Sequence, residues 1–236
     1  DQKMKIIGLM AGGVAHDLNN ILSGIISYPE LLLLDLEKDN RMRRPLESIR
    51  KAGLDAAEVV ADLLTVARGV AATRETINVN TLITDYLKSP DFNQLRIRFP
   101  LVDINKSLDS DILNICCSPI HIRKCLMNLI INGMEAIQGK GTLSISTRNH
   151  IQIAHRQGDT QMLPEGRYTT ITIADSGSGI SPHELEHIFE PFYTKKKMGR
   201  SGTGLGMAVV WGTVEDHRGY ITVGSASGKG TTVSLY

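Results

Sequence analysis

Three polar side chains interrupt an otherwise apolar helical stretch near the start of the chain. In LMAGGVAHDLNNILSGII, residues 9–26, His16 and Asn20 are four residues apart and share a helix face, with Asp17 beside them. An imidazole with a pKa of about 6.5 is partly neutral at pH 7 and can act as a nucleophile. A neighbouring carboxylate can orient the ring or accept its proton. Taken alone, His16 is more simply interpreted as an ordinary polar helix residue.

A second polar group lies on a different predicted helix. NLIINGMEAI, residues 128–137, places Asn128, Asn132 and Glu135 on one face while the aliphatic residues point elsewhere. Asparagine is a weak helix former, so two on one stripe need a reason. Their oxygens suit a hard cation such as Mg²⁺ bound together with phosphates. The alternative is two amides that face solvent.

Two glycine-rich segments could lie close to a flat or anionic ligand. DSGSGI, residues 175–180, follows an apolar strand, and its Asp175 can accept a hydrogen bond from an exocyclic amine beside Gly177 and Gly179. The loop KKKMGRSGTGLG, residues 195–206, leads into an apolar helix whose N-terminus offers backbone N–H groups to an anion. Neither this loop nor GSASGKGTT, residues 224–232, has the spacing of a dinucleotide fingerprint or a P-loop. A plain turn and a surface loop are the alternatives.

Two amphipathic helices are expected to carry the histidine. Apolar residues recur every three or four positions over 3–37 and 44–69, with a turn at 38–45. Pro29 is expected to kink or break the first helix. Because two helices enclose no core, pairing two hairpins into a four-helix bundle is the simplest remedy, and we expect a homodimer.

From about residue 76 the pattern changes to strands alternating with helices. Strands are expected at TINVN, LRIRFPL, TLSISTRN, YTTITIAD, YITVGS and TTVSLY, and helices at 80–88, 119–138, 182–188 and 204–217. This favours an α+β chain in which a helical hairpin, residues 1–75, precedes an α/β sandwich, residues 76–236. TRETINVN, residues 73–80, is a plausible hinge between them.

Composition excludes several classes. A net charge of +1 gives no basic surface for nucleic acid. The longest apolar run, LGMAVVW, is far too short to span a bilayer, and there is no signal-peptide pattern. Cys116, Cys117 and Cys125 lack zinc-ligand spacing and are expected to be buried, reduced thiols. We therefore expect a cytoplasmic segment without membrane contact.

Together and in order, these motifs resemble the kinase core of sensor histidine kinases in two-component signalling. GGVAHDLNNILSGI resembles the phosphoacceptor box, NLIINGMEAI the N box, DSGSGI the first glycine box, and IFEPFYTKK the F box with the start of the ATP lid. GTGLGMAVV resembles the second glycine box and GKGTTVSLY the closing strand. The resemblance covers nearly the whole chain. It implies a dimeric phosphotransfer hairpin followed by a Bergerat-type ATP-binding domain.

The resemblance also implies roles for individual residues. ATP-Mg²⁺ phosphorylates His16, with Asp17 as a helping base, and the phosphoryl group passes to an aspartate of a response-regulator receiver domain. Asn20 positions water if the protein also acts as a phosphatase. Asn132 binds the Mg²⁺, Asn128 lies near the phosphates, and Asp175 binds the adenine amine. The remaining nucleotide contacts are assigned to Glu135, Gly177, Gly179, Lys195, Lys196, Gly202, Thr203, Gly204, Leu205, Gly206 and Thr231.

The sequence departs from the usual pattern at two positions of the N box. Gly133 replaces an alanine and is expected to loosen packing, and Glu135 stands where many kinases carry a basic residue. Two other functions compete with the kinase: a scaffold that has the fold without phosphorylating, and an ATPase of the wider gyrase-like class. Asn128 stands where hydrolysing relatives carry a glutamate base, and an amide cannot activate water in that way, which favours transfer to His16.

Overall fold

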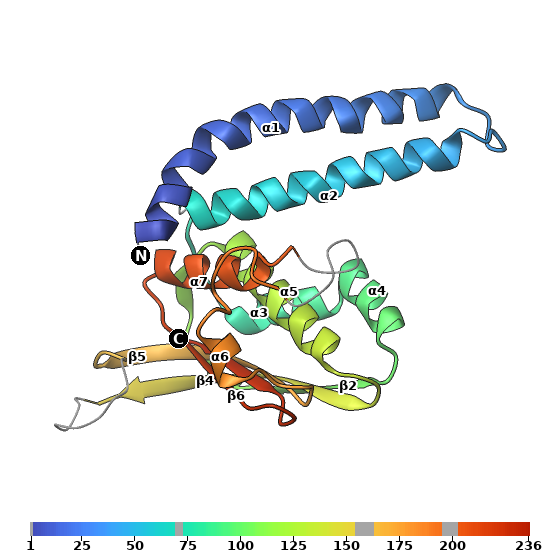
Figure 1. The fold of residues 1–236 in the computed structure, drawn as a ribbon. Helices are drawn as coiled ribbons and strands as arrows, with labels where there is room; N and C mark the ends of the chain where they lie inside the picture. The colour runs from blue at the N-terminus through green and yellow to red at the C-terminus, as the bar shows by residue number, and fades with distance from the viewer. Residues whose placement is uncertain (1, 69–72, 154–162, 195–202) are drawn as a thin grey trace.

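In the computed structural model the chain forms a long helical hairpin beside a domain built on one sheet (Figure 1). The structure describes residues 2–68, 73–153, 163–194 and 203–236, with backbone alone for 2–16 and 65–68. The hairpin consists of α1 (Gln2–Asp35) and α2 (Arg43–Arg68). The sheet domain contains the remaining elements. Within the described part of the chain, no helix is both long enough and apolar enough to cross a membrane.

Helix α1 is unbroken at Pro29, so the expected break is wrong. Proline removes one backbone hydrogen bond, but Pro29 is buried, and helix packing offsets that loss. Leu22 and Val60 form the centre of the contact between α1 and α2, with Ala56, Ala57 and Leu64 around them. Few side chains are fully buried in this contact, and most of the apolar side chains described on α1, over residues 17–35, are exposed.

The sheet has the strand order β2-β4-β5-β7-β6. Its first pair, β2 and β4, is parallel, and all other pairs are antiparallel. A separate antiparallel pair joins β1 to β3. The strands are β1 (Glu75–Ile77), β2 (Val102–Leu108), β3 (Ile115–Cys117), β4 (Gly141–Gln152), β5 (Gly166–Asp175), β6 (Ile221–Ser225) and β7 (Thr231–Leu235).

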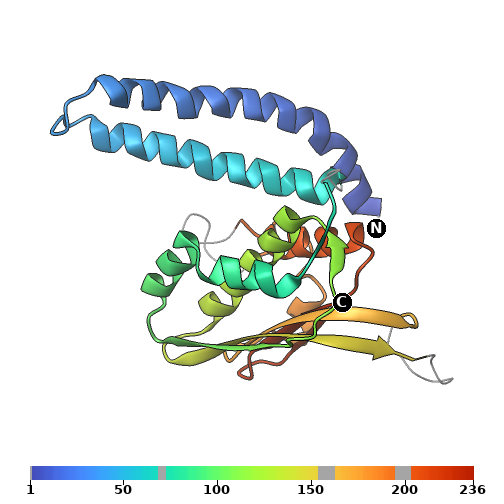
Figure 2. The ribbon, with the colours of Figure 1, turned by 180° about the vertical axis from the view of Figure 1, so that it is seen from behind.

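Helices cover the face of the sheet that lies toward the hairpin, as both views show (Figures 1 and 2). They are α3 (Val79–Leu87), α4 (Pro90–Arg98), α5 (Pro119–Ala136), α6 (Pro182–Leu185) and α7 (Gly206–Asp216). The core lies between α5 and the sheet, where Leu126, Ile130, Met134, Leu143 and Ile145 are almost completely buried. The expected α/β sandwich after a helical hairpin is therefore confirmed.

Two strand predictions are wrong in part. The segment LRIRFPL was expected to be a strand, but residues 95–98 end helix α4. Alternating apolar residues suggested a strand, whereas Ser89 accepts a hydrogen bond from the Phe92 N–H and Pro90 occupies the first helical turn, which together start a helix. In TINVN, the strand ends at Ile77 because Asn78 caps α3.

Candidate nucleotide site

A cavity of about 560 Å³ lies along one side of α5 and is called the α5 cavity below. This volume is typical of small-molecule sites. Side chains from α5, β5 and β7 and from the segments before α6 and α7 surround it. Its apolar part is formed by Leu129, Ile131, Ile173, Ile180, Ile188, Met207, Val223 and Val233. Such a surface suits a flat aromatic ring.

The asparagines of α5 face the α5 cavity, as their spacing predicts. Asn128 donates a hydrogen bond from Nδ2 to the carbonyl oxygen of Gly206, the first residue of α7, over 3.3 Å. Asn132 lies one helical turn further along α5 and also lines the cavity. The amide of Asn128 thus connects α5 to the start of α7.

Glu135 lines the same cavity and carries an ion pair that the sequence did not suggest. Its Oε1 lies 3.2 Å from Nη2 of Arg98 at the end of α4, and only 7% of the Glu135 side chain is exposed. The guanidinium carbon of Arg98 in turn lies 5.1 Å from the centre of the Phe99 ring. A buried carboxylate needs a partner of opposite charge, and Arg98 provides it from a neighbouring helix. The charge of Glu135 is therefore paired by a cation of α4, and Arg98 itself is not among the described lining residues of the α5 cavity.

Asp175 lies at the end of β5 and borders the α5 cavity. Its Oδ1 accepts a hydrogen bond from the Gly177 N–H over 2.8 Å. Burial raises the pKa of Asp175, and backbone hydrogen bonds from Gly177 and Thr231 oppose this increase. The carboxylate is thereby held in one orientation, ready to accept a further hydrogen bond.

Two glycines allow α5 to lie close to Asp175. A Cβ on Gly133 would be 2.5 Å from Cδ1 of Leu143 and 3.4 Å from Cβ of Asp175. A Cβ on Gly177 would be 2.6 Å from the carbonyl oxygen of Ala136. The sequence suggested that Gly133 loosens the packing, and this expectation is wrong. Gly133 instead permits α5 to lie close to Leu143 and Asp175, and a larger residue would push these elements apart.

Gly204 fixes the segment that enters α7. Its φ is +70°, and a Cβ there would be 2.6 Å from the carbonyl carbon of Phe192. The Phe192 N–H donates to the Gly204 carbonyl oxygen over 3.0 Å. Leu205, fully buried, precedes the first turn of α7, and its N–H donates to Oγ1 of Thr203. The N-terminus of α7 thus borders the α5 cavity, where it favours an anion.

Most other predicted binding residues also border the α5 cavity. Gly179, Thr203, Gly206 and Thr231 line it together with Gly204. Lys195, Lys196 and Gly202 lie outside the described residues, and so does the side chain of His16. Asp17 and Asn20 are exposed on α1 and are absent from the described lining of the cavity.

One residue of the cavity comes from the hairpin and was not predicted. Asp62 of α2 lines the α5 cavity. It belongs to an ordinary charged helix face in the sequence, and only the packing of the hairpin against the sheet domain places it there. Arg98 was missed as well, because its helix α4 was predicted as a strand and only helix packing places it beside Glu135.

The donor set of the α5 cavity is compatible with ATP and Mg²⁺. The apolar lining, the oriented Asp175 carboxylate and the N-terminus of α7 match an aromatic ring, an amine and phosphates respectively. Among the described residues there is no cluster of three or more His, Cys, Asp or Glu side chains suited to a metal. Mg²⁺ at a nucleotide takes few protein ligands and is held largely by phosphate oxygens and water, so the amide oxygen of Asn132 would be the residue of this cavity to hold it.

Comparison with known protein families identifies the class. Residues 117–236 match the family described as histidine kinase-, DNA gyrase B-, and HSP90-like ATPase. The chain therefore belongs to this family. Residues 7–71 match the His Kinase A phospho-acceptor domain. The chain is thus a histidine kinase core, with both its phospho-acceptor domain and its ATPase domain.

Named relatives agree with this assignment. Sensor kinase CckA of Brucella abortus is 33% identical over all of this chain and 24% of its own length. Sensor histidine kinase ZraS of Salmonella typhimurium is 30% identical over all of this chain and 46% of its length. Sporulation kinase B of Bacillus subtilis is 28% identical over 99% of this chain and 50% of its length. This chain thus spans half or less of each relative.

Solved structures share the fold. Full-length ShkA in complex with AMPPNP is 20% identical with a TM-score of 0.73, over 96% of this chain and 44% of that chain. The Acinetobacter baumannii histidine kinase AdeS is 20% identical with a TM-score of 0.56, over 92% of this chain and 93% of that chain. The fold, a helical hairpin followed by a sheet domain, is therefore a known one.

Proposed function

We propose that this chain phosphorylates itself on His16 with ATP and then transfers the phosphoryl group to an aspartate of a response-regulator receiver domain. The observation that carries the proposal is the convergence of Asn128, Asn132 and Asp175 on one cavity that α7 closes. Asn128 and Asn132 lie one turn apart on α5, whereas Asp175 comes from the end of β5, and a purely structural role would not require all three to face the same space.

In this proposal the nucleotide lies along α5. The adenine ring rests on the apolar lining, and the carboxylate of Asp175 accepts a hydrogen bond from its amine. The phosphates extend toward Asn128 and the backbone N–H groups that begin α7. Asn132 holds Mg²⁺, which neutralises phosphate charge when bound. Phosphoryl transfer depends mainly on such positioning and charge neutralisation.

Lys195, Lys196 and Gly202 are proposed to contact the phosphates from the loop before α7. Thr203, Gly204 and Gly206 continue that contact, while the fully buried Leu205 anchors the segment from outside the described lining. Gly177, Gly179 and Thr231 shape the adenine side of the cavity. Glu135 is proposed to affect the nucleotide indirectly, by holding Arg98 in position, because its carboxylate already pairs with that guanidinium.

On the hairpin, the neutral imidazole of His16 attacks the terminal phosphorus, the bond to the leaving nucleoside diphosphate breaks, and Asp17 takes the ring proton. His16 and Asp17 are adjacent on α1, and Asn20 follows one helical turn later. Asn20 is proposed to position water when the protein dephosphorylates its regulator. Both Asp17 and Asn20 are exposed, so a partner domain can reach them.

The partner of the hairpin is proposed to be a second copy of this chain. The hairpin exposes several large apolar side chains, among them Tyr28, Leu31, Leu32, Leu34, Ile49 and Leu54. An exposed apolar surface of this kind marks an interface, and two hairpins would form the expected four-helix bundle.

The decisive experiment is incubation with γ-labelled ATP and Mg²⁺. Wild type is expected to gain acid-labile label, and His16→Gln none, while His183→Gln, an exposed histidine of α6, keeps it. Label in His16→Gln, or none in wild type, contradicts the proposal. Steady ATP hydrolysis without labelled protein would favour the ATPase alternative, and neither activity would favour a scaffold.

Asn20→Ala separates the two activities assigned to the hairpin. It is expected to keep autophosphorylation but to slow dephosphorylation of a phosphorylated receiver domain. An equal loss of both rates would contradict a role in positioning water.

A further inference from the structure

The end of helix α4 is fixed in a position that places Arg98 against a residue of the α5 cavity. Arg96 donates a hydrogen bond from Nη1 to the carbonyl oxygen of Val102 over 2.9 Å, which connects the last turn of α4 to the start of β2. The Phe99 ring lies 5.1 Å from the guanidinium carbon of Arg98. Nη2 of Arg98 then lies 3.2 Å from Oε1 of Glu135, which lines the cavity.

The two partners of this ion pair differ in their access to water. Glu135 has only 7% of its side chain exposed, against 54% for Arg98. Water can therefore solvate the guanidinium if the pair separates, but it cannot solvate the buried carboxylate in the same way. Removal of one partner of a buried pair leaves an uncompensated charge, which is strongly unfavourable. The pair thus matters chiefly for the state of Glu135.

The charge of Glu135 is important because the α5 cavity is acidic. The described lining includes four acidic residues, Asp62, Glu135, Asp175 and Glu184, and none of its described residues is Lys or Arg. A triphosphate is itself a polyanion, and two like charges repel more strongly in a partly buried site than in water. Each carboxylate of the lining that loses its neutralising partner therefore opposes triphosphate binding.

Glu135 lies close to the place proposed for Mg²⁺ and the phosphates. It follows Asn132 by three residues on α5 and shares a helix face with it, and such neighbours have Cβ atoms about 5–6 Å apart. Both residues line the α5 cavity. Bound Mg²⁺ cancels only part of the charge of ATP, so an unpaired carboxylate at Glu135 would still repel the nucleotide.

We propose that Arg98 is a positioning residue that cancels the charge of Glu135, and that this ion pair makes the acidic α5 cavity select the triphosphate over the uncharged nucleoside. Glu135 keeps the guanidinium in place, and the guanidinium in turn keeps Glu135 from repelling phosphate. Arg98 acts through Glu135 and does not itself touch the nucleotide. The inference rests on the proposed function, because it takes the cavity to bind ATP.

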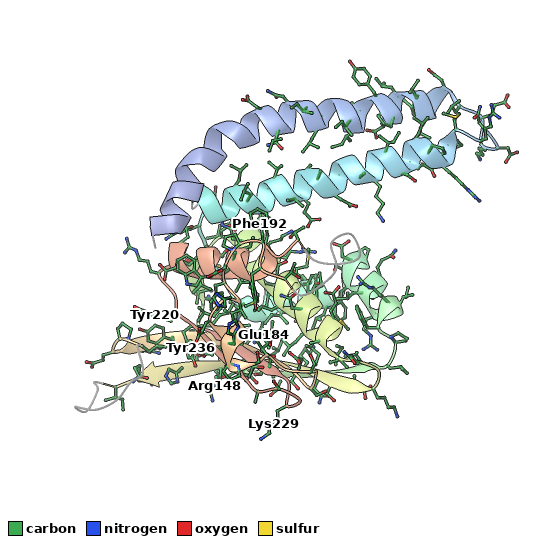
Figure 3. The ribbon with its side chains drawn as sticks, viewed as in Figure 1. Arg148, Glu184, Phe192, Tyr220, Lys229 and Tyr236 are labelled. Atoms are coloured by element: carbon green, nitrogen blue, oxygen red, sulfur yellow. The ribbon has the colours of Figure 1, made fainter. Side chains whose placement is uncertain are left out.

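Selectivity is tested by calorimetry with ATP and Mg²⁺ and, separately, with adenosine. Arg98→Gln is expected to weaken ATP binding about tenfold and to leave adenosine binding within about twofold of wild type. Arg98→Lys keeps the charge, and the double variant Arg98→Gln with Glu135→Gln removes both charges, so each should bind ATP within about threefold of wild type. Arg148→Gln, an exposed arginine of β4 that lies apart from α4, is the matched control and should bind as wild type does (Figure 3).

Three results would overturn the inference. They are an unchanged ATP affinity in Arg98→Gln, an equal loss for ATP and adenosine, and a double variant that binds ATP as weakly as Arg98→Gln does. The last result would mean that the guanidinium contacts the phosphates directly.

The ion pair is also tested without nucleotide, by thermal unfolding. Arg98→Gln is expected to lower the melting temperature, because it leaves the buried Glu135 carboxylate without this partner, and the double variant should recover at least half of that loss. A double variant no more stable than Arg98→Gln overturns the pairing. Wild type that binds neither ATP nor adenosine contradicts the proposed function, whereas wild type that binds ATP beside an unchanged Arg98→Gln contradicts this inference alone.

Discussion

The carboxylate of Asp175 and the backbone N–H of Gly177 are joined by a hydrogen bond of 2.8 Å across the turn that ends β5. This contact uses Oδ1, and Oδ2 lies 3.8 Å from the position that a Cβ would take on Gly133 of α5. One oxygen thus holds the side chain in place, while the carboxylate as a whole borders the α5 cavity. The predictions about nucleotide binding begin from this arrangement.

Asp175→Asn is expected to weaken ATP binding about 10- to 100-fold, the cost of losing a hydrogen bond to a charged group of about 1.5–3 kcal/mol. Calorimetry with ATP and Mg²⁺ measures it. Asp103→Asn, exposed on β2, serves as the control and should bind as wild type does. If Asp175→Asn binds ATP within twofold of the wild-type affinity, Asp175 does not contact the nucleotide.

The pKa of Asp175 also predicts the pH dependence of binding. Burial raises this pKa above that of an ordinary aspartate, so the free protein takes up the proton at a higher pH. If binding needs the carboxylate, affinity is constant above the raised pKa and falls as the pH drops through it. Because burial disfavours the charged form, removal of this charge in Asp175→Asn should not lower the melting temperature of the free protein at pH 7. A lower melting temperature would show that the carboxylate is needed for the fold.

Gly204→Ala tests the segment that enters α7. A residue with a side chain at φ +70° costs about 1–2 kcal/mol, and its Cβ would press on the Phe192 backbone. ATP affinity is expected to fall about tenfold if that segment must keep its conformation to bind phosphates. Gly224→Ala on β6, where a Cβ meets nothing within 4 Å, is the matched control. Equal affinity of the two variants would contradict the role of Gly204.

Leu34→Glu tests the apolar surface of the hairpin. Leu34 is 77% exposed on α1, so a charge there is tolerated in a monomer but not inside a four-helix bundle. Analytical ultracentrifugation should show a dimer for wild type and a shift toward monomer for the variant. Ile97→Glu replaces an aliphatic side chain of α4 that is 78% exposed and should remain dimeric. A wild-type monomer, or a Leu34→Glu dimer of unchanged stability, would contradict the dimer proposed here.

The three cysteines are expected to differ in reactivity, because they differ in burial. Cys116 is exposed on β3, contrary to the expectation of three buried thiols, because successive strand residues face opposite sides. Burial raises the pKa of Cys117 to about 11 and that of Cys125 to about 12. A thiol reagent at pH 8 should therefore modify one thiol rapidly in the folded protein. Cys116→Ser should abolish this fast reaction, and rapid labelling of a second thiol would show that β3 or α5 opens.

Much of the fold follows from local patterns. The two long helices, the strands β4, β5, β6 and β7, and helix α5 were predicted from local sequence patterns and are confirmed. Helix α4 was missed although Ser89 and Pro90 mark its start, because Leu95, Ile97 and Phe99 alternate as in a strand. Local signals conflicted there, and helix capping together with burial of Leu95 against the core decided the outcome.

The residues of the candidate site also fall into two groups, those that the sequence predicts and those that only helix packing places. Asn128, Asn132 and Asp175 could be proposed from the sequence, because helical spacing and strand ends place their side chains predictably. Arg98 beside Glu135 and Lys124 between Glu58 and Asp62 could not. Their positions depend on how whole helices pack, and a shift of a few ångströms would separate the charges.

The sequence by itself determined the order of the elements and which residues could bind a nucleotide, because both depend on neighbours within a few turns or strand positions. The tertiary structure alone decided that a carboxylate of the hairpin lines the α5 cavity and that Glu135 is already paired. Those relationships join residues from separate elements, and only the packing of helices on the sheet and of the hairpin on α7 brings them within reach of one another.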